Sequence, residues 1–353
     1  MKTLDYIPTG KIERAGKLMT TGVKIGGNYI KYIREKITDP KNAKVNFDEN
    51  NAADIYDGLK SLKGSALKVA QMLSMEKNLL PGAYVDKFSL AQFSVPPLSG
   101  PLVRKTFKKY LGEYPEEIFD TFESESVNAA SIGQVHKATH NGKKLAVKIQ
   151  YPGVANSISS DLTLVKPVAT RLFNLKGKDS EKYFKEVEGK LLEETNYLLE
   201  LEQSKSMTQA CSHIPNLKFP NYYKDFSCDK ILTMDWMSGN HLSQYTSKQN
   251  DPHESNLIGQ TLWDFYMYQM HVLKRVHADP HPGNFLVDDS ANLIAIDFGC
   301  IKDVPDDFYV PYFKLAQKDA MEDRDFFIDK ITELEILRPD DSAADSEYIT
   351  DLF

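Results

Sequence analysis

Two short motifs in the last third of the chain constrain its fold more than any other feature. The first is His277 to Asn284, HADPHPGN, with the spacing H-x-D-x-x-x-x-N. The second is Asp297-Phe298-Gly299, which follows a segment with the apolar pattern and turn residues of a β-hairpin, residues 284–296. Because a hairpin returns the chain to its starting point, both motifs are predicted to meet at one site.

The residue types of these motifs indicate phosphoryl transfer. That chemistry needs a carboxylate beside the acceptor and hard oxygen ligands that hold Mg²⁺ against the phosphates. Asp279 is the candidate catalytic carboxylate, and Asn284 and Asp297 are the candidate metal ligands. Either motif alone is also typical of a simple turn. Their combination at this spacing favours a site for ATP and Mg²⁺.

A second predicted hairpin carries a lysine suited to phosphate binding. Its strands, VHKATH and KLAVKIQ, are joined by Asn141-Gly142, a strong signal for a tight hairpin turn. Lys148 lies in the second strand, where a kinase lysine holds the α- and β-phosphates. A strand lysine is more often an exposed edge residue, so its position alone does not decide its role.

A turn of small residues precedes this hairpin and is the candidate phosphate loop. Small residues let backbone N–H groups approach phosphate oxygens. The candidate nucleotide-binding residues in it are Ala129, Ala130, Ser131, Gly133 and Gln134. Gly133 is the one glycine among them, so the match to a glycine-rich loop is weak.

An acidic segment, residues 180–210, is predicted to form one long helix, and a glutamate on it is expected to pair with Lys148. Residues 192–200 contain several glutamates. Helical periodicity does not choose among them, and a solvated helix face would have the same composition.

The order of predicted elements indicates an α+β fold with two lobes. The apolar spacing in residues 10–37 predicts one helix, or two helices separated at Gly26-Gly27. The composition of residues 38–51 predicts a polar loop. Further elements are predicted as helices at 52–77, 83–93, 101–112 and 255–277, and as strands within 217–240. We expect a helical extension at 1–115, a β-rich lobe at 116–240 and a mostly helical lobe at 241–353.

Charge and composition limit the kinds of partner and compartment that we expect for this chain. The net charge of −7 argues against nucleic acid. Three cysteines without metal-ligand spacing indicate free thiols in a reducing compartment, and no signal peptide or membrane-spanning run is apparent, so a cytoplasmic protein is expected. Residues 1–45 carry a net charge of +6, which suits either an anionic membrane surface or a solvated helix face. The oligomeric state stays open.

Over residues 55–300 these features together resemble the UbiB-type family of atypical protein-kinase-like proteins, which includes coenzyme Q-biosynthesis ATPases. Its K-x-G-Q motif resembles Lys68 to Gln71, and the segment after it resembles residues 91–97. Its alanine-rich loop resembles residues 129–136. Its E-x-D motif resembles Glu194 to Asn196, followed by Glu200.

The resemblance implies a two-lobed protein-kinase-like fold whose N-terminal extension packs over the active site. It implies that Glu200 pairs with Lys148, that Lys68 and Gln71 point into the nucleotide pocket, and that Lys68 lies near Glu194. The chain departs from the family pattern at Ala70, Asn128 and Asn196, and it stops 54 residues after Gly299. With these departures nucleotide binding is still expected, while regulation by the extension and membrane attachment are in question.

Three functions compete. The favoured one is an ATPase or phosphotransferase that uses Mg-ATP and acts on a small, lipid-like or quinone-precursor substrate, with Asp279, Lys148 and Glu200 as the catalytic residues. The second is a pseudokinase module whose closure on a nucleotide regulates a partner. The third is a phosphotransferase of the aminoglycoside or choline type, which shares the H-x-D-x-x-x-x-N loop.

Overall fold

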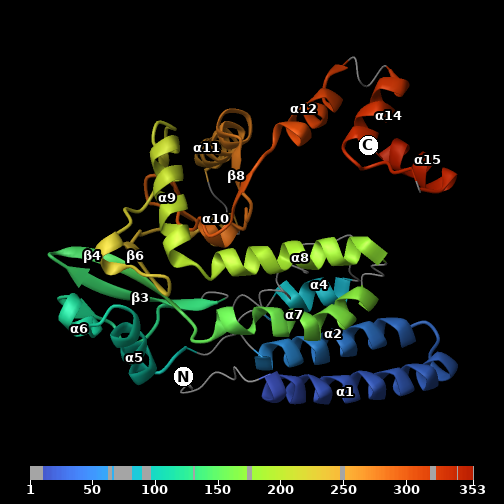
Figure 1. The fold of residues 1–353 in the computed structure, drawn as a ribbon, viewed down its shortest axis with the longest axis horizontal. Helices are drawn as coiled ribbons and strands as arrows, with labels where there is room; N and C mark the ends of the chain where they lie inside the picture. Colours follow the sequence, from blue (N-terminus) through green and yellow to red (C-terminus); the bar gives the residue numbers. More distant parts are fainter. Residues whose placement is uncertain are drawn as a thin grey trace.

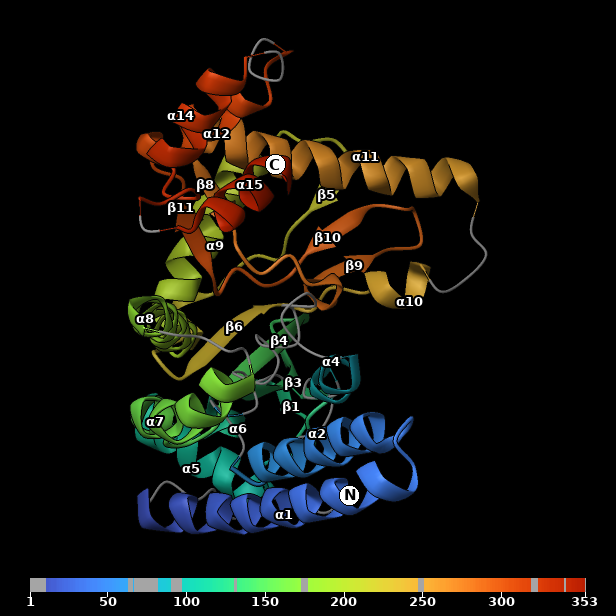
Figure 2. The same cartoon turned by 90° about the vertical axis from the view of Figure 1, so that its right-hand side faces the viewer.

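The structure is a computed structural model that describes residues 11–62, 66, 82–89, 97–129, 132–172, 177–246, 251–318, 323–339 and 341–352. Two β-sheets lie one above the other, with a layer of long helices beside the first and mainly shorter helices around the second (Figures 1 and 2). This arrangement confirms the predicted two-lobed α+β fold. Among the described residues, no helix is long and apolar enough to cross a membrane.

The first lobe contains a five-stranded sheet with the path β1-β3-β4-β6, and β2 pairs with β3. Its strands are β1 (Thr121–Phe122), β2 (Asn128–Ala129), β3 (Gly133–His140), β4 (Lys143–Gln150) and β6 (Ile231–Asp235). The predicted hairpin is confirmed as β3 and β4. Asn141 and Gly142 have φ angles of 51° and 76°, the left-handed backbone that an Asn-Gly turn favours.

The second lobe contains a four-stranded sheet with the order β5-β10-β9-β7 and a two-stranded ribbon of β8 and β11. The strands are β5 (Leu217–Lys218), β7 (Asn240–His241), β8 (Arg275–His277), β9 (Phe285–Val287), β10 (Leu293–Ala295) and β11 (Ile301–Asp303). The predicted hairpin over 284–296 is confirmed as β9 and β10. Phe265, Phe285 and Phe298 are fully buried in this lobe and pack edge to face or tilted.

Helices of the described residues stack in a layer beside the first lobe (Figure 1). They are α1 (Lys11–Thr38), α2 (Ala43–Leu62), α4 (Gly82–Ser89), α7 (Val154–Leu172) and α8 (Gly177–Glu194). The remaining helices are α5 (Gly100–Tyr110), α6 (Pro115–Ile118), α9 (Tyr197–Cys211), α10 (Leu242–Thr246), α11 (Pro252–Tyr268), α12 (Asp306–Leu315), α14 (Arg324–Glu333) and α15 (Ala343–Leu352), with short turns η2 (Lys224–Phe226), η3 (Gln269–Leu273) and η4 (Pro282–Asn284).

Three predictions of secondary structure were wrong, and one helix was not predicted. The segment at 38–51, predicted as a polar loop, is largely helical, because α2 begins at Ala43. Polar side chains of α2 are stabilised by α1, since Asn28 donates to Asn51 and Asp54 at 3.1 and 2.8 Å. The helix predicted at 255–277 ends earlier, because Arg275–His277 form β8. Of the one or two helices predicted for 10–37, the structure has one, α1, which continues through Gly26-Gly27. The segment at 180–210, predicted as one helix, belongs to two helices, α8 and α9. Helix α7 was not predicted. The domain boundaries stay predictions.

Candidate active site

Lys148 lies in the middle of β4, an interior strand that pairs with β3 on one side and β6 on the other. The residue is buried, and its ammonium nitrogen lies 2.8 and 3.1 Å from the two carboxylate oxygens of Glu200. The same nitrogen lies 3.0 Å from Oδ2 of Asp297. Lys148 is therefore not an exposed edge residue: one ammonium group is shared by two carboxylates from distant parts of the sequence.

Glu200 reaches Lys148 because the acidic segment breaks between α8 and α9. Asn196 is the N-cap of α9 and accepts a hydrogen bond from the backbone N–H of Leu199 at 3.1 Å. The cap starts a new helix whose first turn contains Glu200. Asparagine and aspartate are similarly good N-caps, so the departure at Asn196 retains this structural role.

The charges of the three groups depend on one another. Burial lowers the pKa of Lys148, but the Asp297 and Glu200 carboxylates outweigh it and raise that pKa well above its usual value. Burial raises the pKa of Asp297, yet Lys148 and the backbone N–H of Gly299 lower it to about 2. Burial, aided by the Asp297 charge, raises the pKa of Glu200 to about 7 against the opposing effect of Lys148.

Tyr197 is a further member of this cluster that the sequence analysis missed. The Lys148 ammonium lies 5.1 Å from the centre of its fully buried ring. Its position three residues before Glu200 on α9 was the available signal, since such residues share a helix face. A Cβ atom on Gly133 would lie 2.8 Å from the Tyr197 hydroxyl and 2.5 Å from the carbonyl oxygen of Ile149. Gly133 is thus required by close packing where the candidate phosphate loop meets β3.

The candidate phosphate loop is described in part. Ala129 belongs to β2 and pairs with Gln134 across the turn, while Ala130 and Ser131 lie outside the described residues. The Gln134 side chain is fully buried and does not face a nucleotide: its Oε1 accepts from the backbone N–H of Leu98 at 2.7 Å, and its Nε2 lies 2.7 Å from Nε2 of His136. Only the backbone of Gln134 is left for the predicted nucleotide contact.

His136 completes this buried network and links β3 to the segment between β1 and β2. Its Nδ1 lies 2.8 Å from the carbonyl oxygen of Glu123, so Nδ1 carries the proton and Nε2 accepts from Gln134. Burial lowers the pKa of His136. The neutral imidazole therefore holds the Gln134 side chain, which itself joins β3 to Leu98, the residue after the motif segment at 91–97.

The segment of the first motif is held by its own backbone. His281 N–H donates to the carbonyl oxygen of Asp279 at 2.7 Å, and the side-chain amide of Asn284 donates to that oxygen at 2.9 Å. With its NH₂ group used in this way, Asn284 presents Oδ1 as an acceptor. His277, the first residue of the motif, is buried, and its backbone N–H donates to Oε1 of Gln269 at 2.7 Å. No sequence signal marked Gln269.

The two motifs meet through β8 and β11. His277 pairs with Ile301, and the Ala278 N–H donates to the carbonyl oxygen of Cys300 at 2.9 Å. Oδ1 of Asp297 accepts a hydrogen bond from the N–H of Gly299 at 2.9 Å. The Asp297 side chain is 33% exposed. The structure therefore joins the backbones of both motifs and brings Asp297 to Lys148.

Two residues predicted by resemblance, Lys68 and Gln71, lie outside the described residues. Glu194 is the last residue of α8, and its charge contributes to the raised pKa of Glu200. The expected proximity of Lys68 and Glu194 thus stays a prediction.

The oxygen ligands at this site suit magnesium. Asn284 and Asp297 supply hard oxygens, and magnesium takes few ligands from protein when phosphates and water supply the others. Within the described ranges, no cluster of three or more His, Cys, Asp or Glu side chains forms a metal cage.

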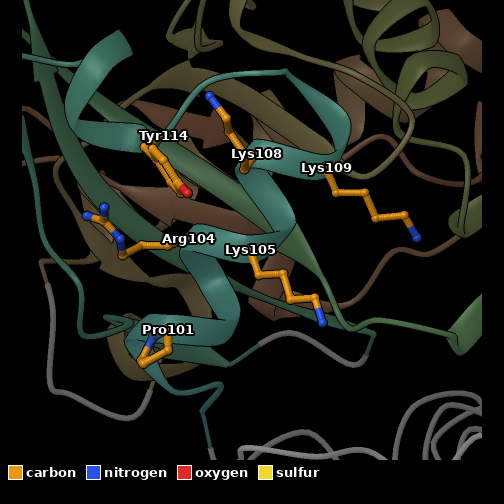
Figure 3. A pocket seen from close by; sticks show the side chains of 6 residues that line it. All are labelled: Pro101, Arg104, Lys105, Lys108, Lys109 and Tyr114. Atoms are coloured by element: carbon orange, nitrogen blue, oxygen red, sulfur yellow. The ribbon is translucent and has the colours of Figure 1, made fainter.

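A basic hollow of about 560 Å³ lies elsewhere, on α5 (Figure 3). Arg104 and Lys108 lie beside the ring of Tyr114 in it and pair with Glu116 and Glu117. The hollow is lined by Pro101, Arg104, Lys105, Lys108, Lys109 and Tyr114. It contains no residue of the Lys148 site.

Comparison with known proteins decides the family. Residues 90–329 match the ABC1 atypical kinase-like domain. The chain belongs to the ABC1 atypical kinase-like family. The resemblance to UbiB-type proteins is thereby confirmed, and the Lys148 cluster lies within the matched domain.

Relatives of this ABC1 chain come from distant organisms. A probable serine/threonine-protein kinase, abkA, from Dictyostelium discoideum is 25% identical over 87% of the chain. The mitochondrial atypical kinase COQ8 of Saccharomyces cerevisiae is 28% identical over 90% of it. The chain spans 58% and 64% of the lengths of these two relatives.

A solved structure shares the fold. Rv3197 of Mycobacterium tuberculosis, in complex with erythromycin, is 25% identical with a TM-score of 0.56. The alignment covers 86% of this chain and 78% of the other.

Proposed function

We propose that this chain binds ATP with Mg²⁺ and transfers the γ-phosphoryl group to water or to a small acceptor. The observation that carries this proposal is the buried Lys148 ammonium, held at 2.8 Å by Glu200 and at 3.0 Å by Asp297. ATP-dependent phosphoryl transfer by kinases uses a lysine paired with a helix glutamate, together with the aspartate of an Asp-Phe-Gly motif that holds Mg²⁺. The corresponding three residues meet here.

Each residue has a role in this proposal. Lys148, oriented by Glu200, would bind the α- and β-phosphates, and the backbone of the loop from Ala129 to Gly133 would cover them. Asp297 and Oδ1 of Asn284 would hold Mg²⁺, which neutralises charge that develops on the phosphates. Asp279 would accept the proton of the acceptor hydroxyl or orient the attacking water.

The Lys148–Asp297 contact has a consequence for nucleotide binding. A phosphate that takes Lys148 must replace one of its two carboxylate partners. Glu200 is nearly fully buried, while Asp297 is one-third exposed and is the proposed Mg²⁺ ligand. Mg-ATP is therefore expected to separate Lys148 from Asp297 and to leave the Lys148–Glu200 pair intact.

The proposed acceptor is a small or lipid-like molecule, such as a quinone precursor. Two observations support this class. The family resemblance extends to coenzyme Q-biosynthesis ATPases, and the relative Rv3197 was solved with a small molecule, erythromycin. We propose that Lys68 and Gln71 control access to the nucleotide, as in the resembling family.

The test is ATP hydrolysis at saturating Mg²⁺, measured for the parent, Asp297→Asn and Asp279→Asn. Asp303→Asn is the matched control, because Asp303 is an exposed aspartate on β11. We expect loss of at least about a hundredfold in rate for the first two variants and parental rates for the control. Parental hydrolysis by Asp297→Asn would refute the proposed catalysis. Nucleotide binding without turnover in the parent, with or without a panel of small acceptors, would favour the pseudokinase alternative.

A further inference from the structure

Helix α1 has two different faces, and one of them is apolar and exposed. The inner face packs on α2: Thr21 is buried where Gly58 leaves room for it, and the ring of Tyr32 lies 4.8 Å from that of Phe47. On the outer face, five apolar side chains are between 49% and 81% exposed. They are Met19, Val23, Ile30, Ile33 and Ile37.

The spacing of the outer residues is that of a coiled-coil seam. With Gly26, they fall at positions 19, 23, 26, 30, 33 and 37, in alternating steps of four and three. A strict repeat with this 3.5-residue period is the pattern that packs one helix against another helix. The helix is roughly 42 Å long at 1.5 Å per residue, long enough for such packing.

We propose that α1 pairs with α1 of a second copy of this chain, in antiparallel orientation around a two-fold axis. In the register that aligns both seams, Met19 faces Ile37 of the second copy, Val23 faces Ile33, and Gly26 faces Ile30. Each layer joins a smaller or more flexible side chain to an isoleucine, and the seam is complementary to itself, as a two-fold interface requires.

Charge selects the antiparallel orientation. The seam is flanked by Arg34 and Lys36 near the C-terminal end of α1 and by Thr20 and Gly22 nearer its other end. A parallel pair would gather the cations of both copies at one end. In the antiparallel register Arg34 faces Thr20 of the second copy and Lys36 faces Gly22, so like charges stay apart.

The seam fits a helix better than a membrane surface. An interfacial helix immerses a broad apolar face with large side chains, whereas this apolar stripe is one seam wide and contains Gly26 at its middle. Binding to an anionic membrane surface was expected only from the basic charge of residues 1–45. Such binding is one of the outcomes that the experiments below distinguish.

The first experiment measures mass against concentration by sedimentation for the full chain. We expect a reversible shift from the 40.0 kDa monomer to twice that mass, at roughly micromolar concentrations, since one helix pair is a small interface. Val23→Glu should weaken the association by at least about tenfold, because it places an unpaired charge in the seam. Val45→Glu, on the exposed surface of α2, is the matched control and should associate like the parent.

The second experiment tests the register by cysteine cross-linking under mild oxidation. Gly27 lies beside the seam, on the flank where Arg34 faces Thr20, and would there face Gly27 of the second copy. A side chain at Gly27 meets no atom within 4 Å in the monomer. Gly27→Cys should therefore form a covalent dimer, whereas Ile37→Cys, at the end of the seam, should not. The parent, whose Cys211 and Cys300 are buried, gives the background.

Three results would overturn the proposal. A parent that stays monomeric to about a hundred micromolar would exclude the pair, and cross-linking of both cysteine variants would exclude the antiparallel orientation. Capture of the monomer by anionic liposomes, lost in Val23→Glu and retained in Val45→Glu, would assign the seam to a membrane surface instead.

Discussion

At the scale of single residues, the site depends on one cation shared by two acids. Lys148 and Glu200 are nearly solvent-free, so each is stabilised by its partner and neither tolerates being left alone. Asp297 is the more exposed of the two acids, and in the proposed function it leaves Lys148 to bind Mg²⁺. Because of this difference in burial, we expect Glu200 to keep its contact with Lys148 and Asp297 to exchange that contact for the metal ion.

Replacing Glu200 by Gln is expected to weaken both ATP binding and the fold. The ammonium of Lys148 would keep Asp297 as a partner, so the free energy of unfolding should fall by about 1 to 3 kcal/mol. Lys148 would then have no carboxylate to hold it when Asp297 turns to Mg²⁺, and the dissociation constant for Mg-ATP should rise at least about tenfold. Chemical denaturation and nucleotide titration measure the two effects separately. An unchanged dissociation constant would contradict the role of Glu200.

Replacing Gly133 by Ala should destabilise the first lobe. The new Cβ atom would meet the carbonyl oxygen of Ile149 at 2.5 Å and the hydroxyl of Tyr197 at 2.8 Å. Overpacking of this kind costs about 1 to 3 kcal/mol. Gly189→Ala on α8, where an added Cβ meets nothing within 4 Å, is the control and should not lower the thermal midpoint. Equal midpoints for both variants would show that β3 and α9 move apart readily.

At the scale of elements, helix ends and hairpins position the site. The Asn-Gly hairpin and the hairpin before Asp297 were predicted correctly, because turn residues and alternation are local signals. The break between α8 and α9 was missed, because a polar Thr-Asn pair interrupts an acidic run without a glycine or proline. The burial of Gln134 could not be predicted, since its partner Leu98 is 36 residues away in sequence.

The N-cap of α9 gives a test of this account. Asn196→Ala should lower the free energy of unfolding by about 1 kcal/mol and weaken nucleotide binding, because the start of α9 orients Glu200. Asn196→Asp retains an oxygen that accepts from Leu199 and should keep the stability of the parent. Denaturation curves of the two variants make the comparison. If both variants behaved alike, the cap would not be what starts α9.

The turn between β9 and β10 predicts a pH dependence of stability. Partial burial raises the pKa of Asp288, but Lys218 and hydrogen bonds from Asn292 and Ser290 outweigh it and lower that pKa to about 2. Because the folded pKa is depressed, this carboxylate stabilises the fold above its usual pKa near 4 and loses that effect as pH falls towards 2. The loss should be about 1 to 2 kcal/mol, allowing for solvent contact.

Unfolding between pH 5 and 2 measures this effect. The parent should lose more stability over this window than Asp288→Asn, which lacks the titrating group. Asp289→Asn, one residue further along the same turn, is the control and should follow the parent. Parallel curves for the parent and Asp288→Asn would contradict the assigned contacts.

At the scale of the whole molecule, two lobes are joined through Lys148, and helices of the extension lie against the first lobe (Figure 2). The sequence predicted this plan because the motifs of both lobes are ordered along the chain. It did not predict α7 or the boundaries of α2, whose polar residues are stabilised by neighbouring helices. The link from Leu98 through Gln134 to His136 ties the segment before α5 to the candidate phosphate loop.

The most direct test of the central claim is thermal unfolding of the parent and Asp297→Asn with ATP, in the presence and absence of Mg²⁺. A ligand that binds only the folded state stabilises it by about 2.7 kcal/mol at a hundredfold excess over its dissociation constant. We predict an ATP-induced rise in the parent that depends on Mg²⁺ and is lost in Asp297→Asn, with Asp303→Asn behaving as the parent. No rise in the parent, or an equal rise in Asp297→Asn, would contradict a Mg-ATP site at Lys148.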